Sequence, residues 1–373
     1  MPIPIPAGLK EVPWWEPEFG GNEARYVDDV LKSGYVNDGK LTEQLEKELS
    51  SRLGARHAVI VTSGTSAIFL ALAGLGIGPG DEVLVPDITF IATANAVQLT
   101  GARPVFVDVE LATLNIDPAD ARRRITPKTK ALVPVHISGR AANMQALQDL
   151  AREKNLFLVE DAAEALGSKH TGKFLGTWGH AGCLSFTANK IVASGQGGAI
   201  LTNDEKLYVR LKELKDQGRP KRGTGGADTH VSVGYNFKFT DIQAAVLKGQ
   251  LEALDSRLAH QRHLYEVYAE ELKPLKGIRL PGFAIQSGEV PLWVDAVIEK
   301  RDIVFDALAA RNIHCRKFWY PLHTQKPYFE AGAKFPKSDQ AAAQALWLPS
   351  SFQLPETDVR YVCQTIRQIL EDS

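Results

Sequence analysis

Short apolar runs alternate with stretches of helical spacing between residues 57 and 202. Each run is continuously apolar rather than alternating with polar residues, which is typical of strands covered on both faces of a parallel sheet. Glycine, proline and polar turn residues separate the runs. The pattern predicts strands at residues 57–61, 82–86, 104–109, 131–135 and 156–160, and two shorter strands at 184–186 and 198–201.

This order of elements predicts βα units wound around a mostly parallel sheet, with helices on both of its faces. A glycine-rich turn at 195–198 separates the last two strands and favours an antiparallel pair. Residues 241–272 form a long, mostly helical stretch that is expected to bridge two domains, and a last helix is expected at 358–371. We therefore expect a large α/β domain over residues 1–250, including an N-terminal segment, and a smaller α+β domain over 251–373.

Composition excludes several classes of partner. The 373 residues carry a formal net charge of -1, so no overall field attracts nucleic acid or an anionic membrane surface. The densest basic cluster, at 219–222, adjoins the glycine-rich 223–226, and we interpret it as a solvated loop, with a local phosphate contact as the alternative. The three cysteines lie far apart, so neither a disulfide framework nor a zinc site is expected.

The ends and the apolar segments carry no sign of export or of membrane insertion. The proline-rich start lacks a basic segment followed by an apolar one, which a secretory signal would show. The longest apolar stretch, around residues 68–77, is too short and too rich in glycine to cross a bilayer. These features predict a protein of the cytoplasm.

A first chemical motif follows the first predicted strand. Ser63, Gly64, Thr65 and Ser66 come directly after that strand and open a helical pattern. Backbone amides and hydroxyl groups then converge at the positive end of a helix, which suits a phosphate. The alternative is structural, a glycine turn in which a serine or threonine caps the helix.

An acid and an amine follow later strands. Asp161 comes directly after the strand predicted at 156–160, at the edge where open α/β sheets bind ligands, and a carboxylate there suits a cationic ring nitrogen. Its alternative role is a helix cap in the string Asp161-Ala162-Ala163-Glu164. Lys190 lies between Ser185 and a glycine-rich turn, so an amine and a hydroxyl are expected to face one cleft. A lysine in a cleft is a natural Schiff-base former, although most lysines are surface charges.

The order of these motifs, a phosphate cup, then an acid, then a serine and a lysine, resembles that of fold-type I pyridoxal-phosphate enzymes. Over nearly the whole chain the sequence resembles the DegT/DnrJ/EryC1/StrS sugar aminotransferases. The resemblance implies a mostly parallel sheet of seven strands with helices on both faces and a smaller C-terminal α+β domain. The strings that carry it are 78–83 (GPGDEV), 160–165 (EDAAEA), 185–190 (SFTANK) and 234–236 (GYN).

The resemblance implies a role for each matching position. Lys190 forms the Schiff base with the cofactor aldehyde and carries protons, and Asp161 pairs with the pyridine nitrogen. Phe90 matches the aromatic that stacks on the cofactor ring, with a core aromatic as the alternative. Asn236, otherwise a turn residue, matches one that reaches the cofactor phosphate across the interface of a homodimer. The other implied contacts are Gly64, Thr65, Ser66 and Ser185 at the phosphate, and Glu164 near the phenolic oxygen.

Positions matching the acceptor pocket are less distinctive, because a lone histidine or tyrosine is more often a packing residue. The sequence also departs from its relatives there: Ser138 and Arg140 stand where an aromatic is frequent, Gln196 stands where glutamate is frequent, and the segment 219–228 is peculiar to this chain. These departures concern the acceptor rather than the cofactor. The implied contacts to the sugar are Tyr35, His136, Arg316 and His323.

The resemblance implies a transamination in two steps. L-Glutamate donates its amino group and leaves as 2-oxoglutarate, and the pyridoxamine form of the cofactor then aminates a nucleotide-linked keto sugar, with a 4-keto-6-deoxyhexose as the favoured acceptor for glycan biosynthesis. One alternative is a 3-keto sugar or inositol aminotransferase, which uses the same cofactor residues. A second is a non-catalytic, regulatory protein that binds the cofactor. A sugar dehydratase is disfavoured because Lys190 is present.

Overall fold

A seven-stranded sheet in the order β1-β9-β8-β5-β4-β2-β3 forms the centre of the computed structural model, which describes residues 11–220 and 229–372. Neighbouring strands are parallel from β8 to β3, whereas β9 runs antiparallel to β8 and to β1. The mostly parallel sheet and the antiparallel pair are confirmed. The strands are β1 (His57–Val61), β2 (Glu82–Pro86), β3 (Arg103–Val107), β4 (Thr129–Leu132), β5 (Phe157–Asp161), β8 (Ala181–Ser185) and β9 (Gly198–Thr202).

The strand β4 ends three residues earlier than the sequence predicts. Val133 still donates its N–H to Leu84, but Pro134 has no N–H to give, and Val135 forms only an isolated bridge with Asp161. The predicted strand at 131–135 was therefore too long at its carboxyl end. The chain that leaves the sheet here becomes part of a turn beside the functional site.

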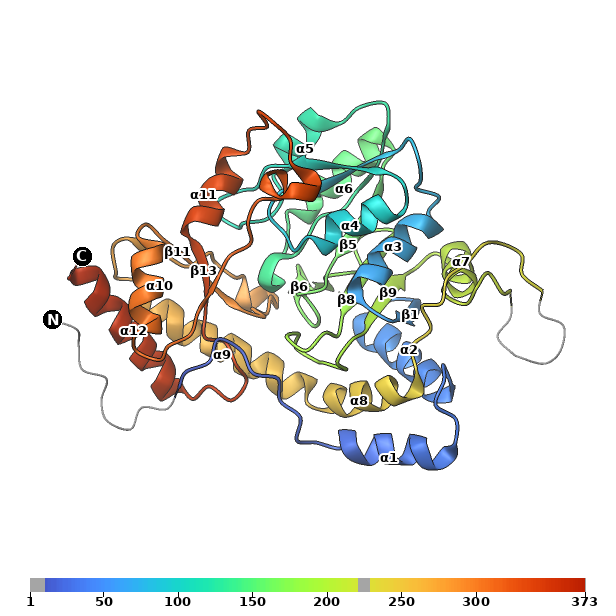
Figure 1. Cartoon of the computed structure of the whole chain (residues 1–373), viewed down its shortest axis with the longest axis horizontal. Coiled ribbons are helices and arrows are strands. Elements are labelled where there is room, and N and C mark those ends of the chain that lie inside the picture. Colours follow the sequence, from blue (N-terminus) through green and yellow to red (C-terminus); the bar gives the residue numbers. More distant parts are fainter. Residues whose placement is uncertain (1–10, 221–228, 373) are drawn as a thin grey trace.

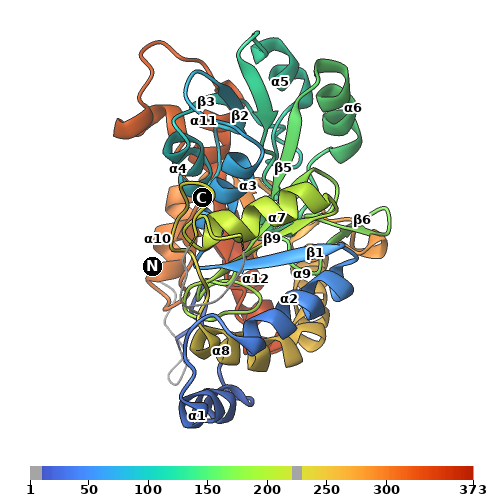
Figure 2. The same ribbon diagram turned by 90° about the vertical axis from the view of Figure 1, so that its right-hand side faces the viewer.

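Helices cover both faces of the sheet because successive strand side chains point to opposite sides. In β1, Val59 and Val61 belong to the apolar cluster with α3, α4 and α7, whereas Ala58 and Ile60 belong to the cluster with α2 and α8. Figure 2 shows α7 and α2 on opposite sides of β1. The covering helices are α2 (Lys40–Leu53), α3 (Gly64–Gly74), α4 (Ala92–Leu99), α5 (Pro118–Arg124), α6 (Met144–Lys154), α7 (Glu205–Lys215) and α8 (Asp241–Glu252).

The long helical stretch after residue 240 consists of two helices rather than one. Helix α8 ends at Glu252, and α9 (Leu254–Leu272) begins after Ala253, whose φ of -92° and ψ of 0° interrupt the helix. The two helices follow one another along the lower edge of the molecule in Figure 1, where α1 (Glu23–Ser33) lies beneath α8. Together they lead from the large sheet to a smaller one.

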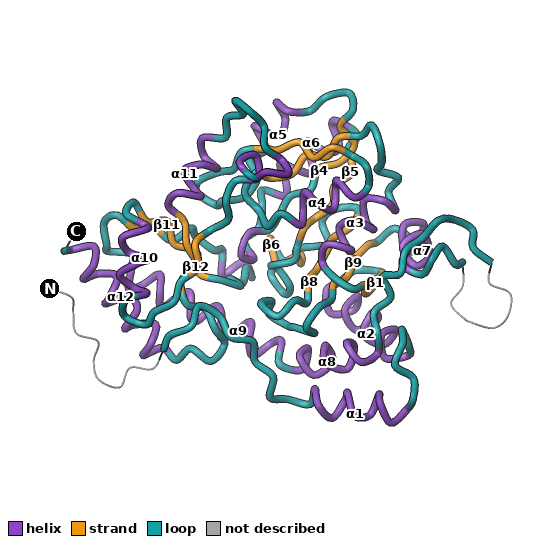
Figure 3. The backbone as a smooth tube through the Cα atoms, in the orientation of Figure 1, coloured by secondary structure: helices purple, strands orange, loops and turns teal. Residues whose placement is uncertain are grey.

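The smaller sheet is antiparallel, in the order β10-β11-β13-β12. Figure 3 shows it apart from the large sheet, on the side of the molecule where α12 lies. Val12 pairs with Ile313, so the N-terminal segment also joins the apolar cluster around the smaller sheet. The division into domains at residue 250 stays a prediction. The strands are β10 (Ile278–Arg279), β11 (Val294–Ile298), β12 (Arg316–Lys317) and β13 (Ala345–Leu348), and the helices are α10 (Arg301–Ala309), α11 (Pro336–Gln344) and α12 (Glu356–Glu371).

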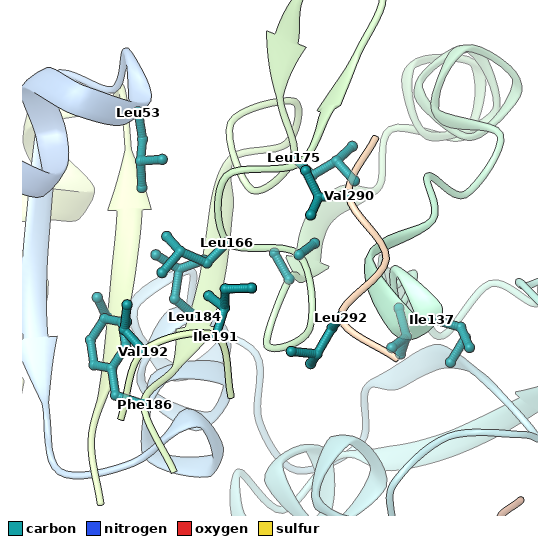
Figure 4. Close-up of a cluster of buried hydrophobic side chains, with 14 of the residues drawn as sticks. Leu53, Ile137, Leu166, Leu175, Leu184, Phe186, Ile191, Val192, Val290 and Leu292 are labelled. Atoms are coloured by element: carbon teal, nitrogen blue, oxygen red, sulfur yellow. The ribbon is translucent and has the colours of Figure 1, made fainter. Parts of the chain in front are cut away.

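Short elements join the two sheets. Figure 4 shows apolar side chains at this junction, where Val290 and Leu292, from the segment before β11, lie beside Leu175 and Ile137. The junction therefore places the segment before β11 against the turn that follows β4. The short elements are η1 (Ile137–Gly139), η2 (Ile285–Ser287), η3 (Leu322–Thr324), η4 (Lys326–Tyr328) and the hairpin β6 (Lys169–His170) and β7 (Lys173–Phe174).

The structure also bears on the expected absence of a membrane span and on the basic segment. Within residues 11–220 and 229–372, no helix is both long enough and apolar enough to cross a bilayer. The basic and glycine-rich segment at 219–226 lies outside the described residues from position 221 onward.

A buried ion cluster joins α2, α7 and β1. Glu46 is 6% exposed, and its carboxylate accepts hydrogen bonds from the Lys215 amine at 3.0 Å, the Lys212 amine at 2.9 Å and the Ile60 N–H at 3.0 Å. Burial by itself would raise the pKa of Glu46, but the two lysines and the Ile60 N–H lower it below its usual value. The cluster therefore stabilises the fold above the pKa of the unfolded glutamate and loses that contribution as the pH falls through the lower, folded pKa.

We expect Lys215→Met to lower the free energy of unfolding by about 3–5 kcal/mol at neutral pH, because it leaves Glu46 buried without its main partner. The loss should shrink as the pH falls from the usual pKa of glutamate through the lower, folded pKa of Glu46, because the carboxylate then becomes protonated. Urea unfolding across this pH range measures both effects. Lys212→Met is the matched control: its side chain is 32% exposed, so the loss should be smaller. Equal losses in the two variants would contradict this account.

Candidate active site

A cavity of about 350 Å³ lies at the carboxyl ends of the parallel strands, where the small sheet closes over the large one. Turns after β1, β2, β4, β5 and β8 form its floor, as expected for a ligand site in an open α/β sheet. The segment before β11 and the region of β12 supply the opposite wall. Among the cavity residues are Ser63, Gly64, Thr65, Phe90, Thr93, Asp161, Glu164, Ser185, Lys190, Trp293, Arg316 and Trp319.

The fold brings most of the predicted site residues to this one cavity, although they come from segments far apart in the sequence. Those that line it are Gly64, Thr65, Phe90, Asp161, Glu164, Ser185, Lys190 and Arg316, whereas Tyr35, Ser66, His136, Asn236 and His323 do not.

Asp161 ends β5 with its carboxylate almost fully buried. One carboxylate oxygen accepts the hydroxyl of Thr93 at 2.7 Å, and the other accepts the N–H of Ala163 at 3.1 Å. Burial raises the pKa of Asp161 above its usual value, and these two hydrogen bonds only partly oppose the effect. A cation beside this carboxylate would relieve the cost of burying its charge. The sequence analysis missed Thr93, although it lies three residues after Phe90, close to one helical turn.

Lys190 and Glu164 meet across the cavity. The Lys190 Nζ lies 3.4 Å from the Glu164 Oε1 and 4.8 Å from the ring centre of Trp293. The lysine side chain is 11% exposed, so its amine faces the cavity rather than bulk water. Burial raises the pKa of Glu164, Lys190 and the Ser138 N–H lower it, and the charge of Asp161 raises it further. The amine thus lies within reach of a carboxylate that holds its proton more tightly than usual.

The start of α3 forms a cup lined by backbone and hydroxyl groups. Ser63 caps the helix by accepting the Ser66 N–H at 3.0 Å, and the Ser66 hydroxyl accepts the Ser63 N–H at 2.9 Å. This capping box occupies Ser66, which explains why it does not line the cavity. A Cβ atom at Gly64 would lie 3.0 Å from that of Ser185, so glycine allows the two segments to approach. Gly64, Thr65 and Ser185 line the cavity at the N-terminus of α3.

Both predicted histidines are held by buried carboxylates instead. His136 is 0% exposed: its Nε2 lies 3.0 Å from Glu160, and its Nδ1 accepts the Ala142 N–H, which gives a neutral ring with the proton on Nε2. His323 pairs through Nδ1 with Asp87 at 2.7 Å. These contacts favour the structural alternative for both residues over a contact with the sugar.

Two other predicted residues lie in separate environments. Tyr35 lines a second cavity with Gly39 and Lys40, next to the start of α2. The Asn236 Oδ1 accepts the amine of Lys238 at 2.8 Å, near Asp216. The predicted reach of Asn236 into a second subunit stays a prediction.

Tryptophans form a wall that the sequence analysis did not anticipate. Trp293 and Trp319 line the cavity, and the Arg316 guanidinium lies 5.0 Å from the ring centre of Trp14 and 5.4 Å from that of Trp347. These residues come from four separate segments, so no spacing in the sequence relates them. Only the pairing of β12 with β13 brings Arg316 and Trp347 together.

Comparison with known proteins agrees with this arrangement. The model of the DegT/DnrJ/EryC1/StrS aminotransferase family matches residues 17–367. A GDP-perosamine synthase of Escherichia coli O157:H7 is 34% identical over 98% of this chain and 100% of its own. The structure of DesV from S. venezuelae, in complex with a ketimine intermediate, is 35% identical, with a TM-score of 0.89 over 94% of each chain. A putative sugar aminotransferase of Streptococcus pneumoniae, in its PMP form, is 25% identical, with a TM-score of 0.92 over 97% of this chain and 98% of its own.

The buried charge of Asp161 predicts that the site costs stability when no ligand is present. Because its folded pKa is raised, Asp161 favours the folded state below about pH 4 and disfavours it as the pH rises through that pKa. We expect Asp161→Asn to raise the free energy of unfolding of the ligand-free protein at neutral pH by about 0.5–2 kcal/mol.

Denaturant unfolding of the ligand-free protein at neutral and at acidic pH measures this gain, which should vanish on the acidic side. Thr93→Val is the companion variant. It removes a hydrogen bond from the same carboxylate, so it should destabilise the protein where Asp161→Asn stabilises it. A destabilised Asp161→Asn variant at neutral pH would contradict the prediction.

Proposed function

The chain belongs to the DegT/DnrJ/EryC1/StrS aminotransferase family, and on this premise we propose that it transfers an amino group from L-glutamate to a nucleotide-linked keto sugar, with pyridoxal 5′-phosphate as its cofactor. The observation that carries the proposal is the meeting of Lys190, Asp161 and the open start of α3 around one cavity. The favoured acceptor is the C4 ketone of a 4-keto-6-deoxyhexose. The name of the Escherichia coli relative supports a GDP-linked sugar, and a role in glycan biosynthesis is part of the proposal.

The cavity fits this cofactor at three points. An anionic phosphate suits the N-terminus of α3, beside the Thr65 and Ser185 hydroxyls and the bare backbone of Gly64. A protonated ring nitrogen suits the buried carboxylate of Asp161, which accepts hydrogen bonds from the neutral groups of Thr93 and Ala163. Phe90 presents a ring that is 54% exposed at the cavity, as a stacking partner requires. The streptococcal neighbour in its PMP form supports the same cofactor.

The protein's part in the reaction is to orient groups and to move protons. When bound, the cofactor supplies an aldehyde that condenses with amines and a ring that withdraws electrons from the carbon that loses its proton. Asp161, held in place by Thr93 and Ala163, keeps a negative charge where a ring nitrogen must stay protonated. Among the described residues that line the cavity, Lys190 is the only lysine, and it takes up and returns a proton at its Nζ. Glu164 orients that amine.

The opposite wall is suited to the substrates. Arg316 offers a planar guanidinium, which matches the oxygens of a carboxylate or a phosphate. Trp293 and Trp319 cover the side of the cavity that faces the small sheet, and so exclude water from the amine of Lys190. A homodimer, in which Asn236 reaches the phosphate of the other subunit, is part of the proposal.

We expect the purified protein to be yellow with bound cofactor and to lose its visible absorption band when L-glutamate is added. The pyridoxamine-charged protein is then offered a panel of GDP-, UDP- and dTDP-linked 3-keto and 4-keto sugars. Mass spectrometry and NMR identify the aminated product, and we expect a 4-amino sugar. A 3-amino product would favour the 3-keto alternative, and persistent colour in glutamate would favour a non-catalytic, regulatory protein.

We expect Lys190→Ala to lower turnover by at least about a hundredfold, because no other described residue of the cavity wall offers an amine to carry the proton. The variant should keep its circular dichroism spectrum and its oligomeric state. Lys206→Ala, at an exposed position of α7, is the matched control and should behave as the parent. Full activity in Lys190→Ala would overturn the assignment.

A further inference from the structure

The turn after β4 connects the cavity to the small sheet. Ser138 lies in this turn with a left-handed backbone, at φ 53° and ψ 20°. Its N–H donates to the Glu164 Oε2 at 2.8 Å, and its hydroxyl donates to the Asp295 Oδ1 at 2.7 Å. The hydroxyl also accepts the indole N–H of Trp347 at 3.1 Å. One residue therefore links a carboxylate of the cavity to two residues of β11 and β13.

Asp295 is itself held rigidly. It lies in β11, is 1% exposed, and accepts the Arg140 guanidinium on its second oxygen at 2.7 Å. Arg140 is 2% exposed and donates further to the backbone oxygens of Thr113, Gly282 and Pro281. The Asp295 carboxylate and the Arg140 guanidinium thus pair with each other, and each oxygen of the carboxylate accepts a hydrogen bond from a different residue. Ser138 and Arg140, which stand where an aromatic residue is frequent in relatives, both bind this one carboxylate.

A buried ion pair adds little net stability compared with apolar residues of similar volume. Its value lies in the geometry that it imposes on its neighbours. Here the contacts form an unbroken series, from Arg140 to Asp295, to Ser138, to Glu164 and finally to the Lys190 amine, with no step longer than 3.4 Å. Since Glu164 gives one oxygen to Ser138 and the other to Lys190, the position of the turn sets the position of the amine's partner.

We propose that Asp295 is a positioning residue for the amino transfer: by holding the Ser138 turn, it keeps Glu164 directed at Lys190. This inference rests on the proposed function, because the amine of Lys190 is the group whose orientation matters. It gives the small sheet a part in the chemistry beyond covering the cavity. A displacement of about 1 Å at such a contact is enough to cost about a hundredfold in rate.

The alternative is that Asp295 only joins the two sheets. Two variants separate the roles. Asp295→Asn keeps the shape but removes the charge that pairs with Arg140. Ser138→Gly leaves that ion pair intact, keeps the backbone N–H and suits the left-handed backbone. It removes the short side chain, and with it the hydroxyl that bonds Asp295 and Trp347. Ser350→Ala is the matched control. Ser350 is likewise fully buried, and its hydroxyl bonds Val294 and Leu348 of the same sheet, without touching the Ser138 turn.

Two measurements are made on each variant and on the Asp295→Asn/Ser138→Gly double variant. The first is hydrogen exchange of the peptide covering residues 136–142 in the cofactor-free protein. The second is the rate at which L-glutamate removes the visible absorption of the cofactor-loaded protein, separated into its value at saturation and the half-saturating concentration. We expect faster exchange and a saturating rate about tenfold lower in both single variants, with little change in half-saturation.

The double variant should be no slower than the slower single variant, because both changes break one series of contacts. Ser350→Ala should match the parent in both measurements. Three results would overturn the positioning role. They are a rate in the double variant reduced by the product of the two single losses, an equal loss of rate in Ser350→Ala, or a normal saturating rate in Ser138→Gly. Failure of the proposed function would look different: the parent itself would ignore glutamate. In that case hydrogen exchange still tests whether Asp295 holds the Ser138 turn, and unchanged exchange in Asp295→Asn would overturn the inference.

Discussion

An excess of buried negative charge is the constraint on which the site depends. Asp161 and Glu164 both line the cavity, and the Lys190 amine lies 3.4 Å from Glu164. Burial raises the pKa of each carboxyl group, because a charge removed from water must be compensated. The protein compensates only in part, through Thr93, Ala163 and Lys190. A cation beside Asp161 would complete the compensation, and the proposed cofactor would offer one as a protonated ring nitrogen.

The sheet makes this arrangement rigid. Asp161 stands at the end of the central strand β5. In the adjacent strand β8, Ser185 is the last residue, and Lys190 follows it in the chain. The carboxylate of Asp161 and the helix N-terminus that suits a phosphate therefore both lie at strand ends of the same sheet. A ligand with a cationic ring and an anionic tail fits such a frame in one direction only, which is how the fold sets the orientation of the proposed cofactor.

The small sheet and the segments next to it complete the cavity. They supply Trp293 and Arg316 directly, and the sheet reaches Glu164 through Asp295 and the Ser138 turn. The same sheet thus provides a wall for substrates and a support for the amine.

The amino-acid sequence by itself determined the strands of the large sheet, the antiparallel pair and the order of the motifs at Gly64, Asp161 and Lys190. These features are local: continuous apolar runs report burial, and short strings of residues report a strand end followed by a turn. Contacts between distant segments were decided by the tertiary structure alone. Ser138 and Asp295 are separated by 157 positions, and no spacing relates them. Likewise, only the fold assigned Ser66 to a helix cap and paired His136 and His323 with buried acids, because a side chain's hydrogen-bond partner depends on which elements pack beside it.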